Sequence, residues 1–144
     1  MYSAVLVALD GSEAAAAAVP RAVEAAQAFA LRLVLLRVVP PIIDEEIGRR
    51  EQDARRAQAE VYVGSLQRSL MARGTKVEAV VESGDPAAVI LKIARSLGSP
   101  LIVLTAYGRN LPRGQDNIGQ VARKVLAESE AAVLLVRPRR REVS

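Results

Sequence analysis

The chain has 144 residues, of which 51% are hydrophobic and 25% charged, a balance typical of a globular, soluble protein of one domain. It contains neither cysteine nor histidine, which excludes a thiol nucleophile, a Ser-His-Asp triad and a zinc site of the usual ligands. The formal net charge is +4, and residues 137–144, with four arginines and one glutamate, account for three of these charges.

The charge does not identify a partner. A solvated basic tail over residues 138–144, after a single domain of residues 1–137, is the expected arrangement, and contact of the tail with RNA or an anionic surface is the alternative. Aromatic residues make up 3% of the chain, too few for platforms that stack single-stranded nucleic acid. No apolar run approaches the roughly 18 residues that cross a bilayer, and the first residues lack the basic start of a signal peptide. We therefore expect a cytoplasmic protein that contacts neither nucleic acid nor membrane.

Hydrophobic segments of strand length alternate with helical patterns along the whole chain. The expected strands are residues 3–9, 31–39, 76–82, 100–106 and 131–137. The expected helices are residues 10–30, 47–73, 84–98 and 117–129.

Particular residues support the first two helices. Ser12 can cap the first, whereas Pro20 lies inside it and should kink it or weaken one turn. The second carries charges of both signs and a stripe of apolar residues at helical spacing, so it is expected to be amphipathic. That stripe is Ala59, Val63, Leu66 and Leu70. Residues 42–50, IIDEEIGRR, either extend this second helix or fold over a pocket as a lid.

The last two helices also carry recognisable ends or faces. Asp85 is the expected N-cap of the third helix, Pro86 its first residue and Gly98 its stop. Its expected buried face is Val89, Ile90, Ile93, Ala94 and Leu97. The fourth helix is expected to begin near Asn117, and its expected buried face is Ile118, Val121, Ala122, Val125 and Leu126.

Strict alternation of strands and helices predicts an α/β fold, an open five-stranded parallel sheet with helices on both faces. Right-handed crossovers favour the strand order 3-2-1-4-5, with strands 76–82 and 131–137 at the edges. The order then reverses between the first and fourth strands, where ligands of such folds bind beyond the carboxyl ends. Two loops meet there, residues 10–12 and residues 105–120.

The loop TAYGRNLPRGQDNIGQ, residues 105–120, has the composition of a phosphate-binding segment. Gly108 and Gly119 allow close approach of the backbone, and Arg109 and Arg113 can neutralise phosphate charge.

The ends of the neighbouring elements add to this interpretation. The free N–H groups of a helix that begins near Asn117 favour an anion, and Asp10 can accept hydrogen bonds from a ribose. The alternative is a plain connector, in which Gly108 ends the strand, Gly114 makes a turn, and Asn117 and Gln120 form a capping box.

Four segments resemble, in the same order, those of universal stress proteins: VLVALDGSEAA, GDPAAVI, LIVLTAYGR and VLLVR. The resemblance covers residues 2–137. It implies a small α/β domain of the adenine nucleotide alpha hydrolase-like type that commonly dimerises through its last strand. It also implies that some members bind ATP between the ends of the first and fourth strands.

In the ATP-binding members of this family, the motif is Gly, two residues, Gly, nine residues, then Gly and Ser or Thr. Its positions fall here on Thr105, Gly108, Gly119 and Gln120, with ten residues between the two remaining glycines. The branched Thr105 crowds the ribose, and Gln120 lacks the small hydroxyl. These departures predict nucleotide binding weaker by about one or two orders of magnitude.

The resemblance further implies that Asp10 contacts the ribose and the Val38 backbone the adenine edge. The expected cofactor is ATP or a related adenine nucleotide, with or without Mg²⁺. The expected binding residues are Asp10, Val38, Thr105, Gly108, Arg109, Arg113, Gly119 and Gln120.

Two functions compete at this stage. One is a nucleotide-binding module in stress response or signalling, and the other is a dimeric scaffold of the same fold that does not bind ATP. No catalytic residue is expected, because no base is well placed, and an enzyme would at most hydrolyse ATP weakly. The apolar edge residues Ala132–Val136 predict a homodimer through the last strand, unless a helix and the basic tail cover that edge.

Overall fold

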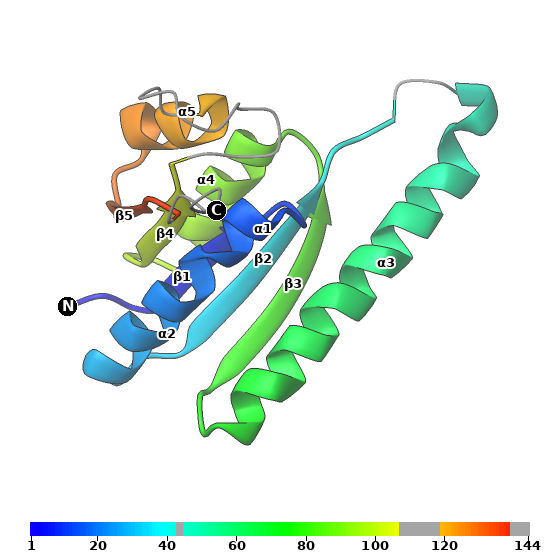
Figure 1. Ribbon diagram of the computed structural model, residues 1–144. Helices are drawn as coiled ribbons and strands as arrows, with labels where there is room; N and C mark the ends of the chain where they lie inside the picture. The colour runs from blue at the N-terminus through cyan, green and yellow to red at the C-terminus, as the bar shows by residue number, and fades with distance from the viewer. Residues whose placement is uncertain (43–44, 107–118, 139–144) are drawn as a thin grey trace, which may run out of the picture.

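The computed structural model of the chain describes residues 1–42, 45–106 and 119–138. In this part, five parallel strands form one sheet in the order β3-β2-β1-β4-β5 (Figure 1), as predicted. Every strand lies within two residues of its expected bounds, and β3 and β5 are the edges. The strands are β1 (Val5–Leu9), β2 (Leu33–Val39), β3 (Val77–Ser83), β4 (Leu101–Thr105) and β5 (Ala132–Val136).

Helices cover both faces of this sheet (Figure 1). One face carries α1 (Glu13–Ala16), α2 (Ala18–Ala28) and α3 (Glu45–Ala72), and the other carries α4 (Pro86–Ser96) and α5 (Gln120–Glu128). Successive side chains of a strand point to opposite faces, so β1, β2 and β4 contribute to two apolar cores, one under each helical layer. None of the described helices has both the length and the apolar character needed to cross a bilayer.

The first expected helix is broken, as Pro20 predicted, but the break comes earlier, at Ala17. Proline has no N–H to donate to the carbonyl of Ala16, four residues before it. The chain therefore ends α1 and starts α2, which places Pro20 in a first turn where its missing N–H costs little. Ser12 caps α1 as expected, because its Oγ accepts a hydrogen bond of 3.0 Å from the Ala15 N–H.

The long helix α3 settles the alternatives for residues 42–50. It begins at Glu45, so residues 45–50 extend the helix, whereas residues 43–44 lie outside the described part. The predicted stripe is confirmed, because Ala59, Val63 and Leu70 are buried and Leu66 packs against the same core.

The expected ends of α4 are confirmed. Asp85 accepts a hydrogen bond of 3.0 Å from the Ala88 N–H, Pro86 is the first helical residue, and Gly98 follows the helix with φ of +89°. Val89, Ile90 and Ala94 of its predicted face are buried, whereas Ile93 and Leu97 are half-buried against the same core.

The prediction for the last helix was wrong in two respects. Helix α5 begins at Gln120 rather than near Asn117, because the Gly119 N–H donates to the Ala106 carbonyl at 2.7 Å and Gly119 is extended. Only Ala122 and Val125 are buried, whereas Val121 and Leu126 are 39% and 42% exposed. This short helix lies over the edge of the sheet, so only a narrow strip of its side chains is buried, and the wider predicted face stays partly exposed. Ile118 lies outside the described residues.

Candidate functional site

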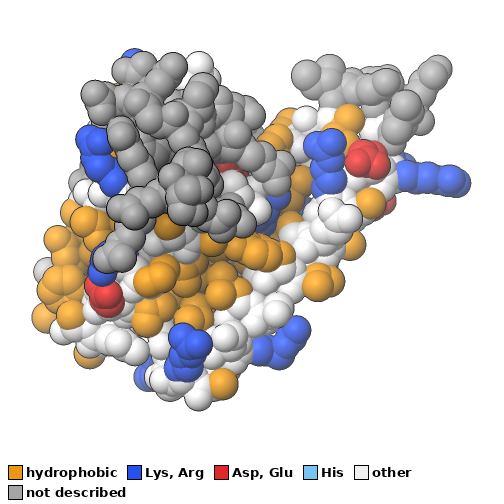
Figure 2. All heavy atoms as spheres, in the orientation of Figure 1, with side chains coloured by type: hydrophobic (Ala, Val, Ile, Leu, Met, Phe, Trp, Pro, Cys, Tyr) orange, Lys and Arg blue, Asp and Glu red, His pale blue; other side chains and the backbone are white. Residues whose placement is uncertain are grey.

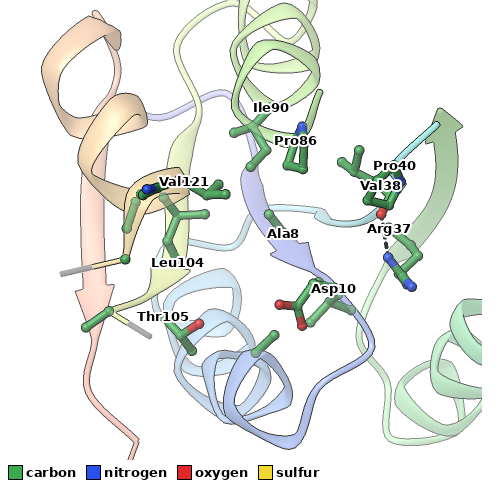
Figure 3. Close-up of a pocket in the computed structure, with 16 residues that line it drawn as sticks. Ala8, Asp10, Arg37, Val38, Pro40, Pro86, Ile90, Leu104, Thr105 and Val121 are labelled. Atoms are coloured by element: carbon green, nitrogen blue, oxygen red, sulfur yellow. Dashed lines mark hydrogen bonds between the residues drawn. The ribbon is translucent and has the colours of Figure 1, made fainter. Parts of the chain in front are cut away.

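A cavity of about 500 Å³ lies at the carboxyl ends of the strands, at the point where the strand order reverses between β1 and β4 (Figure 3). We call it the switch-point cavity. Its volume is in the range of small-molecule sites, about 300–1,000 Å³. Of the eight residues predicted for the nucleotide site, five line it: Asp10, Val38, Thr105, Gly119 and Gln120.

The other three predicted residues are Gly108, Arg109 and Arg113. They lie outside the described residues, as does most of the glycine- and arginine-bearing loop. The two ends of that loop, Thr105 and Gly119, are described, and both lie at the cavity across from Asp10. The described ends of this loop therefore lie at one cavity with Asp10, and the roles of the three residues stay predictions.

Asp10 is held at the cavity by a short turn. Its Oδ1 accepts a hydrogen bond of 2.8 Å from the Ser12 N–H, and Gly11 between them has φ of +85°, which glycine adopts without strain. Among the described residues, Oδ2 has no hydrogen-bond partner. Within the described part of the chain, Asp10 thus has one carboxylate oxygen that a ligand's hydroxyl group could donate to.

The wall beside Asp10 is apolar. Val38 and Pro40 come from the end of β2, and Pro86 and Ile90 come from the start of α4 (Figure 3). Leu104 on β4 lies in the same lining. Apolar walls with a few polar groups at one side are the usual form of a cofactor site.

The start of α5 forms the opposite side. Gly119, Gln120 and Ala122 line the cavity, and the N-cap Gly119 has no side chain that could cap the helix. The positive end of the helix dipole therefore lies at the cavity. This arrangement contradicts a capping box at Asn117 and Gln120, because the helix begins one residue after Gly119.

Arg37 is a lining residue that the sequence interpretation missed. Its guanidinium donates a hydrogen bond to the carbonyl of Val38, the residue whose backbone is expected to contact the adenine edge (Figure 3). A base bound there must share this carbonyl with Arg37 or displace it. The indication in the sequence was a charged residue inside the otherwise apolar strand LVLLRVV.

Comparisons with known proteins agree with this geometry. The model of the Universal stress protein family matches residues 1–137. A universal stress protein of Thermus aquaticus, from the 3′ region of a QAH/OAS sulfhydrylase, is 30% identical over 145 residues and covers 95% of this chain and 100% of its own length. The solved structure of universal stress protein UspA from Lactobacillus plantarum is 27% identical, covers 94% of this chain and 98% of its own, and has a TM-score of 0.80.

Two further solved structures of the same fold contain nucleotides. One is a universal stress protein in complex with cAMP, which is 23% identical, with a TM-score of 0.66 over 94% of this chain and 97% of its own. The other is the universal stress protein from Archaeoglobus fulgidus in complex with dAMP, which is 19% identical, with a TM-score of 0.67 over 93% of this chain and 97% of its own.

Proposed function

Because the chain belongs to the universal stress protein family, we propose that it is a nucleotide-binding module of stress response or signalling. It holds ATP or a related adenine nucleotide in the switch-point cavity. One observation carries this proposal: a single cavity is lined both by Asp10, whose Oδ2 has no hydrogen-bond partner among the described residues, and by the start of α5. The cAMP and dAMP complexes of two proteins of this fold support an adenine nucleotide as the ligand.

The proposed binding mode follows the polarity of the cavity. The base lies against Val38 and the apolar wall, and the ribose hydroxyls donate to Asp10. The phosphates lie at Gly119 and the first N–H groups of α5, where the helix dipole favours negative charge.

The remaining predicted residues belong to the phosphate end. We assign the backbone of Gly108 and the guanidinium groups of Arg109 and Arg113 to the phosphates. Mg²⁺, when present, would bind mainly phosphate oxygens and waters at this end, while Asp10 holds the ribose. The ion would neutralise phosphate charge.

Calorimetry on nucleotide-stripped protein tests the proposal. ATP with Mg²⁺ should bind saturably, and Asp10→Asn should weaken binding because an amide is a poorer acceptor for the ribose hydroxyls. A mass spectrum of the native protein should detect copurified adenine nucleotide. Absence of heat at millimolar ATP would contradict the proposal. If the protein binds ATP but releases phosphate from it no faster than buffer alone does, the protein does not hydrolyse ATP.

A dimeric scaffold that does not bind ATP is the second candidate, and the engagement of the Val38 carbonyl by Arg37 favours it. Arg37→Leu separates the two candidates, because it frees the carbonyl for an adenine amino group. Tighter ATP binding in this variant supports a nucleotide site that Arg37 restrains, whereas no binding in either protein supports the scaffold.

We also propose a homodimer through β5. This strand is an edge, and its residues Ala132 and Leu134 are exposed, the latter by 40%. Pairing with β5 of a second copy would satisfy the free backbone groups of both strands and bury these side chains.

A further inference from the structure

A second cavity of about 500 Å³ lies between α2 and α3, on the face of the sheet that these helices cover, and we call it the helix groove. Helix α2 packs on β1, β2 and β4, whereas α3 packs on β2 and β3, so the two helices are spread apart above β2. Figure 2 shows hydrophobic side chains gathered on this face between α2 and α3. The groove shares no lining residue with the switch-point cavity.

Most of the length of the helix groove is apolar. Val19, Pro20 and Val23 of α2 line one side, and Tyr62 and Leu66 of α3 line the other. Of these, Val19 is buried and the rest are partly buried or exposed at the groove. The lining suits a narrow aliphatic chain, since one aromatic ring and several branched side chains form the sides of the groove.

One end of the groove is polar. Helices α2 and α3 both run from the carboxyl end of the sheet to its amino end (Figure 1), so their last residues lie at the same end. Gln27 near the end of α2 and Ser69 and Arg73 near the end of α3 line the groove, together with Thr75, which follows α3. The groove therefore has the polarity of an amphiphile, with an apolar length and a polar end.

Thr75 is the residue at this end that most needs a partner. It is 7% exposed and is the only buried polar residue among those whose burial the structure describes. Its N–H donates to the Leu70 carbonyl, but its hydroxyl Oγ1 has no hydrogen-bond partner. An unpartnered buried hydroxyl destabilises a fold, and native proteins contain few of them.

The charge at this end is positive. Arg73 is exposed and forms no ion pair or side-chain hydrogen bond with any described residue. No acidic residue is among those that line the groove. The exposed Arg73 guanidinium and the buried Thr75 hydroxyl, two positions apart in the chain, thus both lack an acceptor among the described residues, and an anionic group that enters far enough to meet Oγ1 could accept from both.

We propose that the helix groove binds a small aliphatic carboxylate. Its tail lies between Val19, Val23 and Leu66, and its carboxylate accepts hydrogen bonds from Thr75 Oγ1 and the Arg73 guanidinium. This site is independent of the nucleotide site, and it gives the unpartnered hydroxyl of Thr75 an acceptor. A carboxylate is favoured over a neutral head group, because hydrogen bonds between a guanidinium and a carboxylate are the stronger ones.

Decanoate, used below its micelle concentration, is a suitable probe on the full chain. Calorimetry should give saturable binding of one decanoate per chain, and amide NMR shifts should concentrate on Val23, Leu66 and Thr75. The uncharged analogue 1-decanol has the same tail and should bind at least about tenfold more weakly, because hydrogen bonds to charged groups are the stronger ones.

Two variants and one matched control identify the head-group site. Thr75→Val and Arg73→Gln should each weaken decanoate binding about tenfold or more. Arg68→Gln should leave it unchanged, because Arg68 is exposed on the same helix but does not line the groove. Thr75→Ser keeps the hydroxyl and should retain most of the affinity.

Folding of the variants is checked by thermal unfolding. Valine has nearly the shape of threonine, so Thr75→Val should unfold at the same or a higher temperature than the parent protein in the absence of decanoate. A folded Thr75→Val protein with unchanged decanoate affinity would overturn the proposal. So would a lack of saturable binding, an equal loss in Arg68→Gln, or shifts that concentrate around Asp10.

Self-association through the groove is the remaining alternative. If a second copy of the chain fills it, Thr75→Val and Arg73→Gln should change the mass in sedimentation without any decanoate, which would also overturn the proposal. An unchanged mass together with weaker decanoate binding supports a ligand site.

Discussion

The switch-point cavity and the helix groove have the same volume, about 500 Å³, but different parts of the fold form them. Strand ends and the starts of helices form the first, where backbone N–H groups and the Asp10 carboxylate are available to a ligand. The sides of two helices form the second, and its polar groups are the side chains where those helices end. The comparison shows that one small α/β domain has two cavities of different chemistry, one suited to the proposed phosphates and one to an apolar body.

The largest effect is expected at β5, which contributes no residue to either cavity. Leu134→Arg should dissociate the proposed homodimer, because an unpaired charge at a strand-to-strand interface costs about 4 kcal/mol, roughly a thousandfold in the dissociation constant. Sedimentation checks this, and an unaltered mass would reject the β5 interface. ATP and decanoate should both still bind the monomer, and loss of either would show that its site depends on the dimer.

Gly119→Val should impair ligand binding in the switch-point cavity and leave binding in the helix groove unchanged. Gly119 has φ of −61° and ψ of 158°, an extended conformation that valine adopts, so the fold should survive. The new side chain would enter the switch-point cavity in front of the free N–H groups of α5 and weaken ATP binding about a hundredfold. Calorimetry with both ligands checks this, and decanoate binding should be unchanged. Unchanged ATP affinity would place the phosphates elsewhere.

Gln120→Ser should tighten nucleotide binding by about tenfold. It restores a small hydroxyl beside the proposed phosphate position at the first residue of α5, and a hydrogen bond to a charged group is worth about 1.5 kcal/mol or more. Gln58→Ser, on the exposed side of α3, is the matched control and should have no effect on ATP affinity. Equal affinities in Gln120→Ser and the parent protein would show that residue 120 does not contact the phosphates.

The smallest effect is expected in α3, away from both linings. Gly64→Ala should raise the free energy of unfolding by about 0.5–1 kcal/mol, since the added methyl group would meet only the flexible Arg68 side chain, at 3.6 Å. Gly74→Ala should instead destabilise the protein, because Gly74 has φ of +89°. Urea unfolding measures both. A change of the same sign in the free energy of unfolding of both variants would contradict this account. A changed affinity of Gly64→Ala for either ligand would show that α3 couples the cavities, whereas Gly74 lies between the groove residues Arg73 and Thr75 and does not test this.

Much of the fold was predictable because local residues carry it. Pro20 interrupts the first helix, Asp85 and Pro86 begin α4, and Gly98 ends it. The stripe through Val63 on α3 follows from helical spacing alone. The strand order followed from the alternation of elements together with the handedness of parallel crossovers.

The candidate site was predictable to a smaller extent. The position of Asp10 and Gly119 at one cavity follows from the reversal of strand order, and it is where the structure places them. The contact of Arg37 with the Val38 carbonyl was not expected, because the direction of a long side chain at the end of a strand depends on its neighbours. The narrow buried strip of α5 likewise depends on where that helix lies over the sheet edge.

Taken by itself, the amino-acid sequence determined the strands, the ends of α4, the order of the strands and the edge at which the order reverses, since these depend on spacing, capping and chain handedness. The tertiary structure alone decided how far α2 stands from α3, and so whether a groove exists between them. It also decided that Thr75 is buried with an unpartnered hydroxyl. Both depend on distances between segments far apart in the chain, and helical or strand periodicity does not encode such distances.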